Sequence, residues 1–409
     1  MIVFNKIKEI TTKLSIVNSC ERINTKDENF KFYKCKIETP NSFCFSYGVD
    51  SSKSRARKKS FLEGIERYCI DFNKENKKRM LLDSYSRIKE NAIDPQILFP
   101  FLKSQYNQKG FKYKKPDNAS KIYWVKGSRL SNKEKIYIPA SSVYCDYQFS
   151  KFEKKIGRST SNGCAIGQGL NNAVLNGILE LIERDIVLVG WFNKLSSPRI
   201  SIDSMSHQLK TILKSVENNY QVKVIISSYK SDFQIPVVSI LLIGDKIPYF
   251  TFGSAADFSI KKAIIKALQE SLLIREELKN LRISSFKYKD LNKIQNLYQH
   301  AEFYAININQ GIFDFLINSP VINYKEYKKN EFSYKNTIDK LTYLKDSCEK
   351  TKKDVFFIDL SLDIVKKVGL RVVRVLIPRL QSLNSEYNCR YLGNPRIHTF
   401  SNKDPHPIG

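Results

Sequence analysis

The sequence of 409 residues contains no long uncharged apolar run. Its longest such segments, residues 235–244 and 186–192, are far shorter than the roughly 18–20 residues that span a bilayer. Residues 1–6 show no charged region followed by an apolar stretch, which is the pattern of a signal peptide. These absences predict a cytoplasmic protein with no membrane partner. The 42% of hydrophobic residues is enough for a packed core.

Cysteine and histidine are not arranged as zinc ligands. The chain has eight cysteines and four histidines, but no Cys-x-x-Cys pair and no histidine at ligand spacing from a cysteine. Zinc is therefore not expected, and the cysteines of a cytoplasmic protein are expected to be free thiols. Cys164 lies in a Gly-rich segment, but no histidine is near it in sequence, so a nucleophilic role is not favoured.

Acidic residues are few beside the basic ones. The 68 Lys and Arg against 41 Asp and Glu give a net charge of +27. Such a charge suits a nucleic-acid binder, but it also follows from a general abundance of Lys, Asn and Ile. The lysines are scattered over amphipathic segments, with no RNA-binding, zinc-finger or homeodomain pattern, so nucleic acid is not the expected partner. A positive surface still attracts an acidic peptide, an acidic protein or ATP.

One short motif, Glu-x-x-Glu-Arg, occurs twice, as Glu63, Glu66 and Arg67 and as Glu180, Glu183 and Arg184. Residues three apart are neighbours on a helix, so each copy brings two carboxylates together in an apolar stretch. Buried like charges need a cation. One interpretation is a set of salt bridges within each helix. The other is a Mg²⁺ site that takes carboxylates and nucleotide phosphates. The repeat also hints at an internal duplication.

The surrounding pattern predicts an α/β protein in which helices carry these carboxylates. Apolar residues surround the segment 172–191 on almost every side, which is typical of a buried central helix. A helix is expected over 55–72, and a third over about 260–272, following a small-residue loop at 252–256. Strands are expected at the following ranges: 122–125 and 136–139 as a hairpin, 222–227, 237–243, 355–360 and 371–377. Residues 1–40 should be an irregular or strand-like lead-in, and residues 290–352 should form Lys-rich surface helices and loops.

A Gly-rich loop at 159–169 precedes the central helix, and its backbone N–H groups are suited to bind an anion. Glu270 on the third helix adds a fifth carboxylate. Together these features predict an ATP–Mg²⁺ centre for phosphoryl transfer, which works by positioning and charge neutralisation. Neither the GxxxxGK[ST] phosphate loop nor a kinase catalytic loop is present.

The motifs, in this order, resemble those of the YcaO family. They are Phe61-Leu-Glu-Gly-Ile-Glu-Arg-Tyr68, then Asn162-Gly-Cys-Ala-Ile-Gly-Gln168, Asn172-Ala173, Leu179-Glu-Leu-Ile-Glu-Arg-Asp185 and Trp191, then Phe252-Gly-Ser-Ala255, Ala263 and Ala267-Leu-Gln-Glu270, and finally Ile358-Asp-Leu-Ser361 and Gly369-Leu-Arg-Val-Val-Arg-Val-Leu-Ile-Pro378. The resemblance runs from about residue 45 to the end of the sequence. It implies a single large α/β domain over 41–409 with mixed sheets and a helix-lined ATP–Mg²⁺ site, after a lead-in at 1–40.

The resemblance also implies a chemistry. Members of the family use ATP to activate a backbone amide, and the cyclodehydratases convert Cys, Ser or Thr of a precursor peptide into a thiazoline or oxazoline. Carried over by motif, the metal-binding residues would be Glu63, Glu66, Glu180, Glu183 and Glu270. The residues at the nucleotide would be Arg67, Gln168, Asn172, Arg184, Lys266 and Glu270. Thioamide or amidine formation uses the same activation and remains an alternative.

The tail at 403–409 adds an indication of subtype. Cyclodehydratases of the family often end in a Pro-rich tail that reaches the active site, and Pro405, His406 and Pro407 fit that pattern without its last proline. The alternative is a disordered terminus. In a working tail these three residues would be catalytic, with His406 moving protons.

Two departures keep a non-catalytic scaffold open as a further alternative. Asn172 stands where the family has a glutamate, and Lys266 stands where a glutamine is usual; the segment Gly48-Val-Asp50 also lacks the family's Gly-Lys-Gly. The expected partners are a precursor peptide, a separate leader-binding protein of the ubiquitin-activating type and a flavin-dependent dehydrogenase. A homodimer within such a complex is left open.

Overall fold

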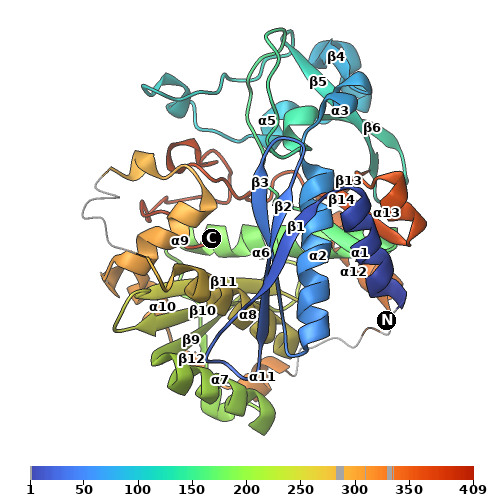
Figure 1. Cartoon of the computed structure of the whole chain (residues 1–409). Coiled ribbons are helices and arrows are strands. Elements are labelled where there is room, and N and C mark those ends of the chain that lie inside the picture. The colour runs from blue at the N-terminus through green and yellow to red at the C-terminus, as the bar shows by residue number, and fades with distance from the viewer. Residues whose placement is uncertain (1, 282–289, 309, 329–333, 335) are drawn as a thin grey trace.

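The computed structural model describes residues 2–281, 290–308, 310–328, 334 and 336–409. Within these residues the strands form three sheets around one long helix, α6 (Leu170–Phe192). Figure 1 shows α6 crossing the middle of the molecule, with one sheet in front of it and the others above and below. The α/β prediction is confirmed, and α6 matches the buried helix expected over 172–191.

The sheet in front of α6 is antiparallel, in the order β1–β2–β3. Its strands are β1 (Val17–Ile23), β2 (Lys31–Glu38) and β3 (Phe43–Asp50). The first glutamate motif lies on α2 (Lys53–Ile70), which packs on this sheet and confirms the helix expected over 55–72. The predicted break between residues 40 and 41 falls inside the β2–β3 hairpin.

The lead-in over 1–40 was expected to be irregular or strand-like, which is only half right. It also contains a helix, α1 (Ile2–Lys13). Ile7 and Ile10, one turn apart, are buried against α2 in the same cluster as Ile65. This narrow apolar stripe on a short, polar segment is a weak sequence signal for a helix.

A second sheet has the order β4–β5–β13–β14–β7, with β6 paired to β5. Its strands are β4 (Leu81–Ser84), β5 (Lys121–Arg129), β6 (Lys135–Pro139), β7 (Cys164–Gln168), β13 (Phe356–Asp359) and β14 (Leu370–Leu376). The β5–β6 hairpin and the two late strands confirm the predictions. The Gly-rich segment was wrongly expected to be all loop, because its second half is β7, which pairs with β14.

The third sheet has the order β11–β10–β9–β8–β12. Its strands are β8 (Arg199–Ile200), β9 (Val222–Tyr229), β10 (Val237–Gly244), β11 (Phe250–Ala256) and β12 (Val321–Ile322). Strands β9 and β10 confirm the prediction. The segment 252–256 was wrongly expected to be a loop: it lies within β11, whose small residues let α8 (Ile260–Leu278) pack closely on it. The helix α7 (His207–Tyr220) contacts β9.

The remaining helices connect these layers. They are α3 (Lys74–Lys78), α4 (Tyr85–Ile88), α5 (Pro95–Leu98), α9 (Leu297–Ile306), α10 (Asp314–Ile317), α11 (Tyr324–Lys328), α12 (Thr337–Lys350) and α13 (Asp363–Lys367). Of the segment expected to be surface helices, residues 309, 329–333 and 335 lie outside the described residues. The surface prediction is wrong for α9, where six consecutive residues from His300 to Ala305 are buried.

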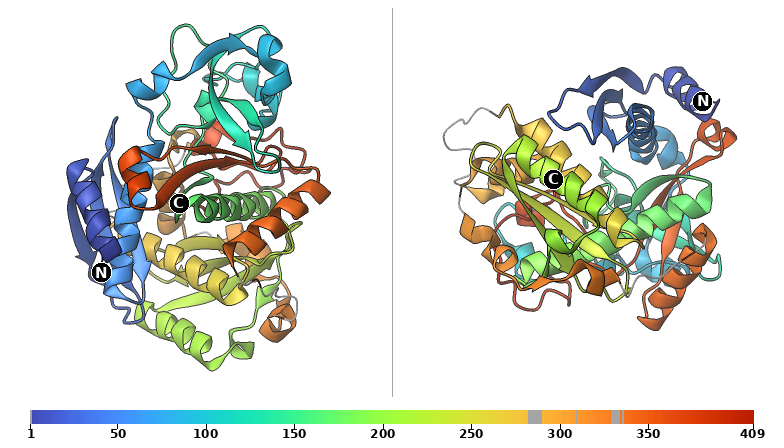
Figure 2. Two further views of the ribbon diagram at one scale, coloured as in Figure 1. Left: turned by 90° about the vertical axis from the view of Figure 1, so that its right-hand side faces the viewer. Right: turned by 90° about the horizontal axis from the view of Figure 1, so that it is seen from below.

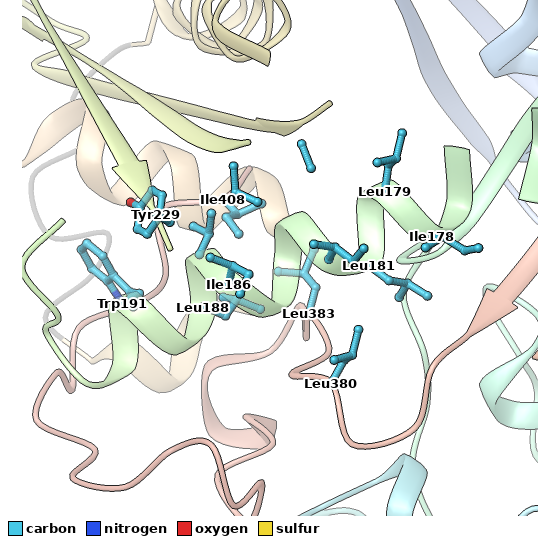
Figure 3. Packing of buried hydrophobic residues seen from close by; sticks show 14 of the residues in the cluster. Ile178, Leu179, Leu181, Ile186, Leu188, Trp191, Tyr229, Leu380, Leu383 and Ile408 are labelled. Carbon is cyan, nitrogen blue, oxygen red and sulfur yellow. The ribbon is translucent and has the colours of Figure 1, made fainter. Parts of the chain in front are cut away.

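The central helix α6 is apolar on all sides because it is covered on all sides. Figure 2 shows it between β14 on one side and α8 with the third sheet on the other. Figure 3 shows Ile178, Leu181 and Ile186 pointing from α6 into this core, with Leu383 and Ile408 of the C-terminal segment against them. No helix in the described part of the chain is both long and apolar enough to cross a membrane.

Two glycines let a helix that carries glutamates approach its strand closely. A Cβ atom on Gly48 of β3 would lie 1.9 Å from the carbonyl oxygen of Ala56 on α2, and one on Gly253 of β11 would lie 2.3 Å from that of Ala267 on α8. Both distances are impossible for real atoms, so each position requires glycine. The two contacts set the distance between the sheets and the helices that form the site.

Candidate active site

A large cavity of about 1290 Å³ lies where β3, α2, α6, α8 and α9 meet. Four of the five predicted glutamates and both motif arginines line it: Glu63, Glu66, Glu180, Glu270, Arg67 and Arg184. Glu183 lies behind the wall and is buried. The structure therefore brings together the two Glu-x-x-Glu-Arg motifs and the third helix, although they come from distant parts of the sequence.

The motif on α2 is anchored partly within its helix and partly by other elements. The Arg67 Nη2 lies 3.0 Å from Glu63 Oε1, which is an intrahelical pair. The other Glu63 oxygen accepts the Tyr47 N–H of β3 at 2.8 Å, and Glu66 accepts the Ile166 N–H of β7 at 2.9 Å. Burial raises the pKa of Glu66 to about 8, partly opposed by Arg67.

The motif on α6 is joined to β11 and α8. Arg184 contacts Glu183 at 2.9 Å through Nη1 and Glu270 at 3.2 Å through Nη2. The Ser254 hydroxyl donates to Glu183 at 2.7 Å, and the Ser254 N–H donates to Glu270 at 2.7 Å. Burial raises the pKa of Glu183 to about 8, and burial also raises that of Glu180, which accepts the Gly163 N–H at 3.3 Å.

These contacts bear on the two sequence interpretations. The Glu63–Arg67 and Glu183–Arg184 pairs fit the intrahelical salt-bridge set, whereas Glu66, Glu180 and Glu270 each accept a backbone N–H from another element. Such N–H bonds fix carboxylate oxygens without supplying a cation. Burial raises the pKa of Glu66 and Glu183 more than the neighbouring Arg67 and Arg184 lower it, so a further cation beside them would favour their ionised form.

The chemistry of the site suits a nucleotide with Mg²⁺. Among the described residues no three His, Cys, Asp or Glu side chains already form a metal cage. Mg²⁺ is usually held by one or two carboxylates together with substrate phosphates. Arg184 Nε is also buried and has no hydrogen-bond partner in the described structure, so a donor remains for a phosphate oxygen. Glu66, Glu180 and Glu270 would hold the ion, and Arg184 would contact phosphate.

Three residues predicted to contact the nucleotide do not line this cavity: Gln168, Asn172 and Lys266. Gln168 is exposed, and its carbonyl accepts the Asn172 side-chain amide at 2.7 Å. Thr337 of α12 donates to the Asn172 amide oxygen at 2.8 Å. Lys266 is half exposed and pairs with Asp257 at 2.7 Å. Their predicted roles stay predictions, and the side chains of Asn172 and Lys266 already have protein partners.

The tail is buried in the core. Trp191 Nε1 of α6 donates to the Asp404 carbonyl at 3.3 Å, Tyr304 of α9 donates to the Pro405 carbonyl, and the His300 ring contacts the His406 carbonyl at 3.1 Å. Pro405, His406 and Pro407 are buried, and Gly409 is the tail residue that lines the cavity. The alternative of a disordered terminus is wrong. A catalytic role for the three residues stays a prediction, and the His406 ring lies in the core, 0% exposed.

The His406 ring stacks on His300 with centroids 3.8 Å apart and planes 6° apart. Burial lowers the pKa of His300 to about 4 and that of His406 further below its usual value. The unfolded chain therefore binds protons first, so stability falls as the pH drops from about 6.5 towards 4. We expect unfolding free energy between pH 7 and 5 to fall by roughly 2 kcal/mol more in wild type than in His300→Phe.

Urea unfolding at both pH values measures this difference. Replacing the exposed His207 by Phe is the matched control and should leave the fall as in wild type. An equal fall of the unfolding free energy in His300→Phe and in wild type would contradict the conclusion that the two buried histidines are neutral in the folded protein.

Several residues of the site carried no clear signal in the sequence. Arg374 of β14 is fully buried and donates to the carbonyls of Val143 at 2.9 Å, Thr160 at 2.7 Å and Asn162. It thereby fixes the loop whose Gly163 N–H binds Glu180. Ser254 lay inside the quoted Phe252-Gly-Ser-Ala motif, but its contacts depend on α8 and α6 packing together.

Comparison with known proteins identifies the fold. Residues 47–381 match the model of a family described as YcaO cyclodehydratase, ATP- and Mg²⁺-binding. The chain belongs to the YcaO family. The first motif, the second motif and Glu270 all lie inside the matched segment. A YcaO relative by sequence is an uncharacterized protein of Methanothermobacter thermautotrophicus, 21% identical over 345 residues, which are 82% of this chain and 81% of the relative.

Solved structures share the YcaO fold. A heterocyclase in complex with substrate and cofactor aligns with a TM-score of 0.78 and 18% identity, over 92% of this chain and 52% of its own. The YcaO of Methanopyrus kandleri, bound with AMPPCP and Mg²⁺, aligns with a TM-score of 0.67 and 15% identity. The alignment covers 92% of this chain and 90% of the Methanopyrus chain. A chain of the E. coli microcin synthetase McbBCD complex aligns with a TM-score of 0.66 and 15% identity. The alignment covers 95% of this chain and 96% of that chain. This YcaO chain spans about half the length of two heterocyclases. It covers 52% of the heterocyclase in complex with substrate and cofactor and 46% of the heterocyclase TruD.

Proposed function

We propose that this chain is the ATP-dependent subunit of a peptide cyclodehydratase. The observation that carries the proposal is the cavity in which two Glu-x-x-Glu-Arg helices and Glu270 converge, in a chain of the YcaO family. The substrate is a ribosomally made precursor peptide. A Cys, Ser or Thr side chain attacks the preceding carbonyl carbon and loses its proton, and the carbonyl oxygen takes the γ-phosphoryl group of ATP, which releases ADP. Phosphate then leaves and the amide nitrogen loses its proton as the C=N bond of the thiazoline or oxazoline forms.

The chain's own residues contribute charge and position. Glu66, Glu180 and Glu270 would hold Mg²⁺, and Arg184, itself held by Glu183 and Glu270, would orient a phosphate. The tail at 404–409 passes between α6 and α9 and places Gly409 on the cavity wall, which supports a role for the tail at the site.

The partners belong to the same proposal. A separate leader-binding protein of the ubiquitin-activating type would deliver the peptide, and a flavin-dependent dehydrogenase would oxidise azolines. Two findings support partner proteins: a microcin synthetase with this fold is a McbBCD complex, and one such structure has pro-MccB17 bound. The proposed location is the cytoplasm.

The competing function is a non-catalytic YcaO subunit that scaffolds the complex. It is favoured by Asn172 and Lys266, which lie outside the cavity with protein partners. Thioamide or amidine formation would use the same activation and differs only in the nucleophile.

Mass spectrometry of the precursor peptide separates these functions. With ATP, Mg²⁺, the partner protein and the peptide encoded beside it, we expect the loss of one water per ring and one ATP hydrolysed for each. Gain of sulfur in place of oxygen would indicate thioamide formation. An unmodified peptide together with no ATP hydrolysis would overturn the proposal in favour of the scaffold.

A further inference from the structure

The strand β3 is an edge strand that faces the cavity. Its sheet has the order β1–β2–β3, so β2 pairs with β3 on one side only. Four residues of β3 line the cavity: Cys44 and three residues spaced two apart, Phe43, Phe45 and Tyr47. Figure 1 shows β3 on the side of its sheet that faces α9 and the C-terminus. An edge strand presents a row of backbone N–H and C=O groups to an added strand.

The direction of this row follows from one hydrogen bond. The Tyr47 N–H donates to Glu63 Oε2 at 2.8 Å, so it points away from β2. In an antiparallel pair the backbone groups of alternate residues point to the same side. The N–H and C=O groups of Phe45 and Phe43 therefore also point outward, in line with Tyr47. The row begins at the Glu63 carboxylate and leads away from the glutamate cluster.

The side chains on this wall would support an extended peptide. Phe43 and Phe45 are 59% and 46% exposed, which is unusual for aromatic rings. Lys34 of β2 lies over the Phe45 ring at 4.1 Å and pairs with Glu277 of α8 at 2.6 Å; Tyr47 donates to the same Glu277 at 2.8 Å. Exposed aromatic rings beside an ion-paired lysine offer contacts to varied side chains of a peptide.

The volume of the cavity also calls for a second ligand. At about 1290 Å³ it exceeds the roughly 300–1,000 Å³ typical of a small-molecule site. Its lining contains the glutamates and arginines and also the exposed rings of Phe43 and Phe45 on β3. A nucleotide at the carboxylates leaves the β3 wall open.

We infer that the outward edge of β3 at Phe43 and Phe45 binds the substrate peptide as an added, extended strand. The inference rests on the proposed function, because it names how that same site holds its peptide. Main-chain hydrogen bonds supply affinity in this mode, and alternate side chains contact the wall. A strand added here runs directly to Glu63 and so brings its backbone amides to the carboxylate centre.

A proline scan tests the inference. Phe45→Pro removes the outward N–H without breaking the β2 ladder, since proline is tolerated on an edge strand whose N–H faces outward. Phe45→Ala removes the ring and keeps the N–H. The probe is a fluorescein-labelled pool of 12-residue peptides randomised over Gly, Ser, Thr and Cys, with Mg²⁺ and AMPPCP present. Anisotropy should show at least tenfold weaker binding to Phe45→Pro than to Phe45→Ala.

A second measurement does not depend on the variant folding. The same pool, N-methylated at every residue, cannot donate strand hydrogen bonds from either edge, and wild-type protein should bind it at least tenfold more weakly. Equal binding of both pools, or of the plain pool to both variants, would overturn the inference, as would a wild type that binds AMPPCP but no peptide. A wild type that fails to bind AMPPCP would instead contradict the proposed nucleotide site.

Discussion

ATP turnover is expected to fall by at least about 10³-fold when Glu180 and Glu183 are both replaced by glutamine. Glu180 lies on the cavity wall, and Glu183 holds Arg184 and Ser254 from behind it. Glutamine keeps the shape and the hydrogen bonds of each side chain but removes its negative charge. The site would then lose both an ion ligand and the group that orients its arginine.

Two readouts check this prediction. Titration with AMPPCP and Mg²⁺ tests the nucleotide site without a peptide, and ATP hydrolysis with partner and precursor tests the reaction. The control exchanges two exposed glutamates, Glu75 and Glu349, for glutamine, and should leave both readouts near wild type. Turnover within tenfold of wild type in the Glu180→Gln, Glu183→Gln protein would reject the carboxylates as the metal site.

Arg374→Met is expected to lower the free energy of unfolding by roughly 3–5 kcal/mol. The guanidinium is fully buried and satisfies carbonyl oxygens of Val143, Thr160 and Asn162. Methionine fills most of the volume but leaves these acceptors unpaired in the core, and each unpaired group costs about 1–3 kcal/mol.

Urea unfolding of three proteins measures the effect. Arg371 lies on the same strand, is partly exposed and pairs with Asp359 at 3.6 Å, so Arg371→Met is the matched control and should cost less than about 1 kcal/mol. Arg374→Lys keeps the charge but cannot reach all three carbonyls. Its loss of unfolding free energy should lie between the losses of Arg371→Met and Arg374→Met. Equal losses for Arg374→Met and Arg371→Met would show that the buried guanidinium has no special role.

The helices and long strands were predictable because their patterns are strong. The segment 172–191 is apolar all round, and β10 is an uncharged run that is apolar except for Ser239, so both could be placed from the sequence. β7 and β11 were missed because they are short and rich in glycine, serine and alanine. Small residues there serve close packing of α6 and α8, a demand that arises only from tertiary structure.

The carboxylates of the site were predictable, but their environment was not. Spacing alone placed Glu180 and Glu183 on one helix turn. No pattern shows that the backbone N–H groups of Gly163, Ile166 and Ser254 hold carboxylates of the site, since those contacts cross between elements. Their partners are Glu180, Glu66 and Glu270, in that order. For the same reason, the motif match could not show that Asn172 and Lys266 would have partners outside the cavity.

The acidic cavity lies inside a protein with a net charge of +27. At long range such a protein attracts anions and speeds their encounter, an effect that salt weakens. At short range, a divalent ion that accompanies the triphosphate would reduce its charge and favour the ionised form of the buried carboxylates, whose pKa values burial raises. The long-range attraction and the local carboxylates together would favour binding of nucleotides in their metal-complexed form.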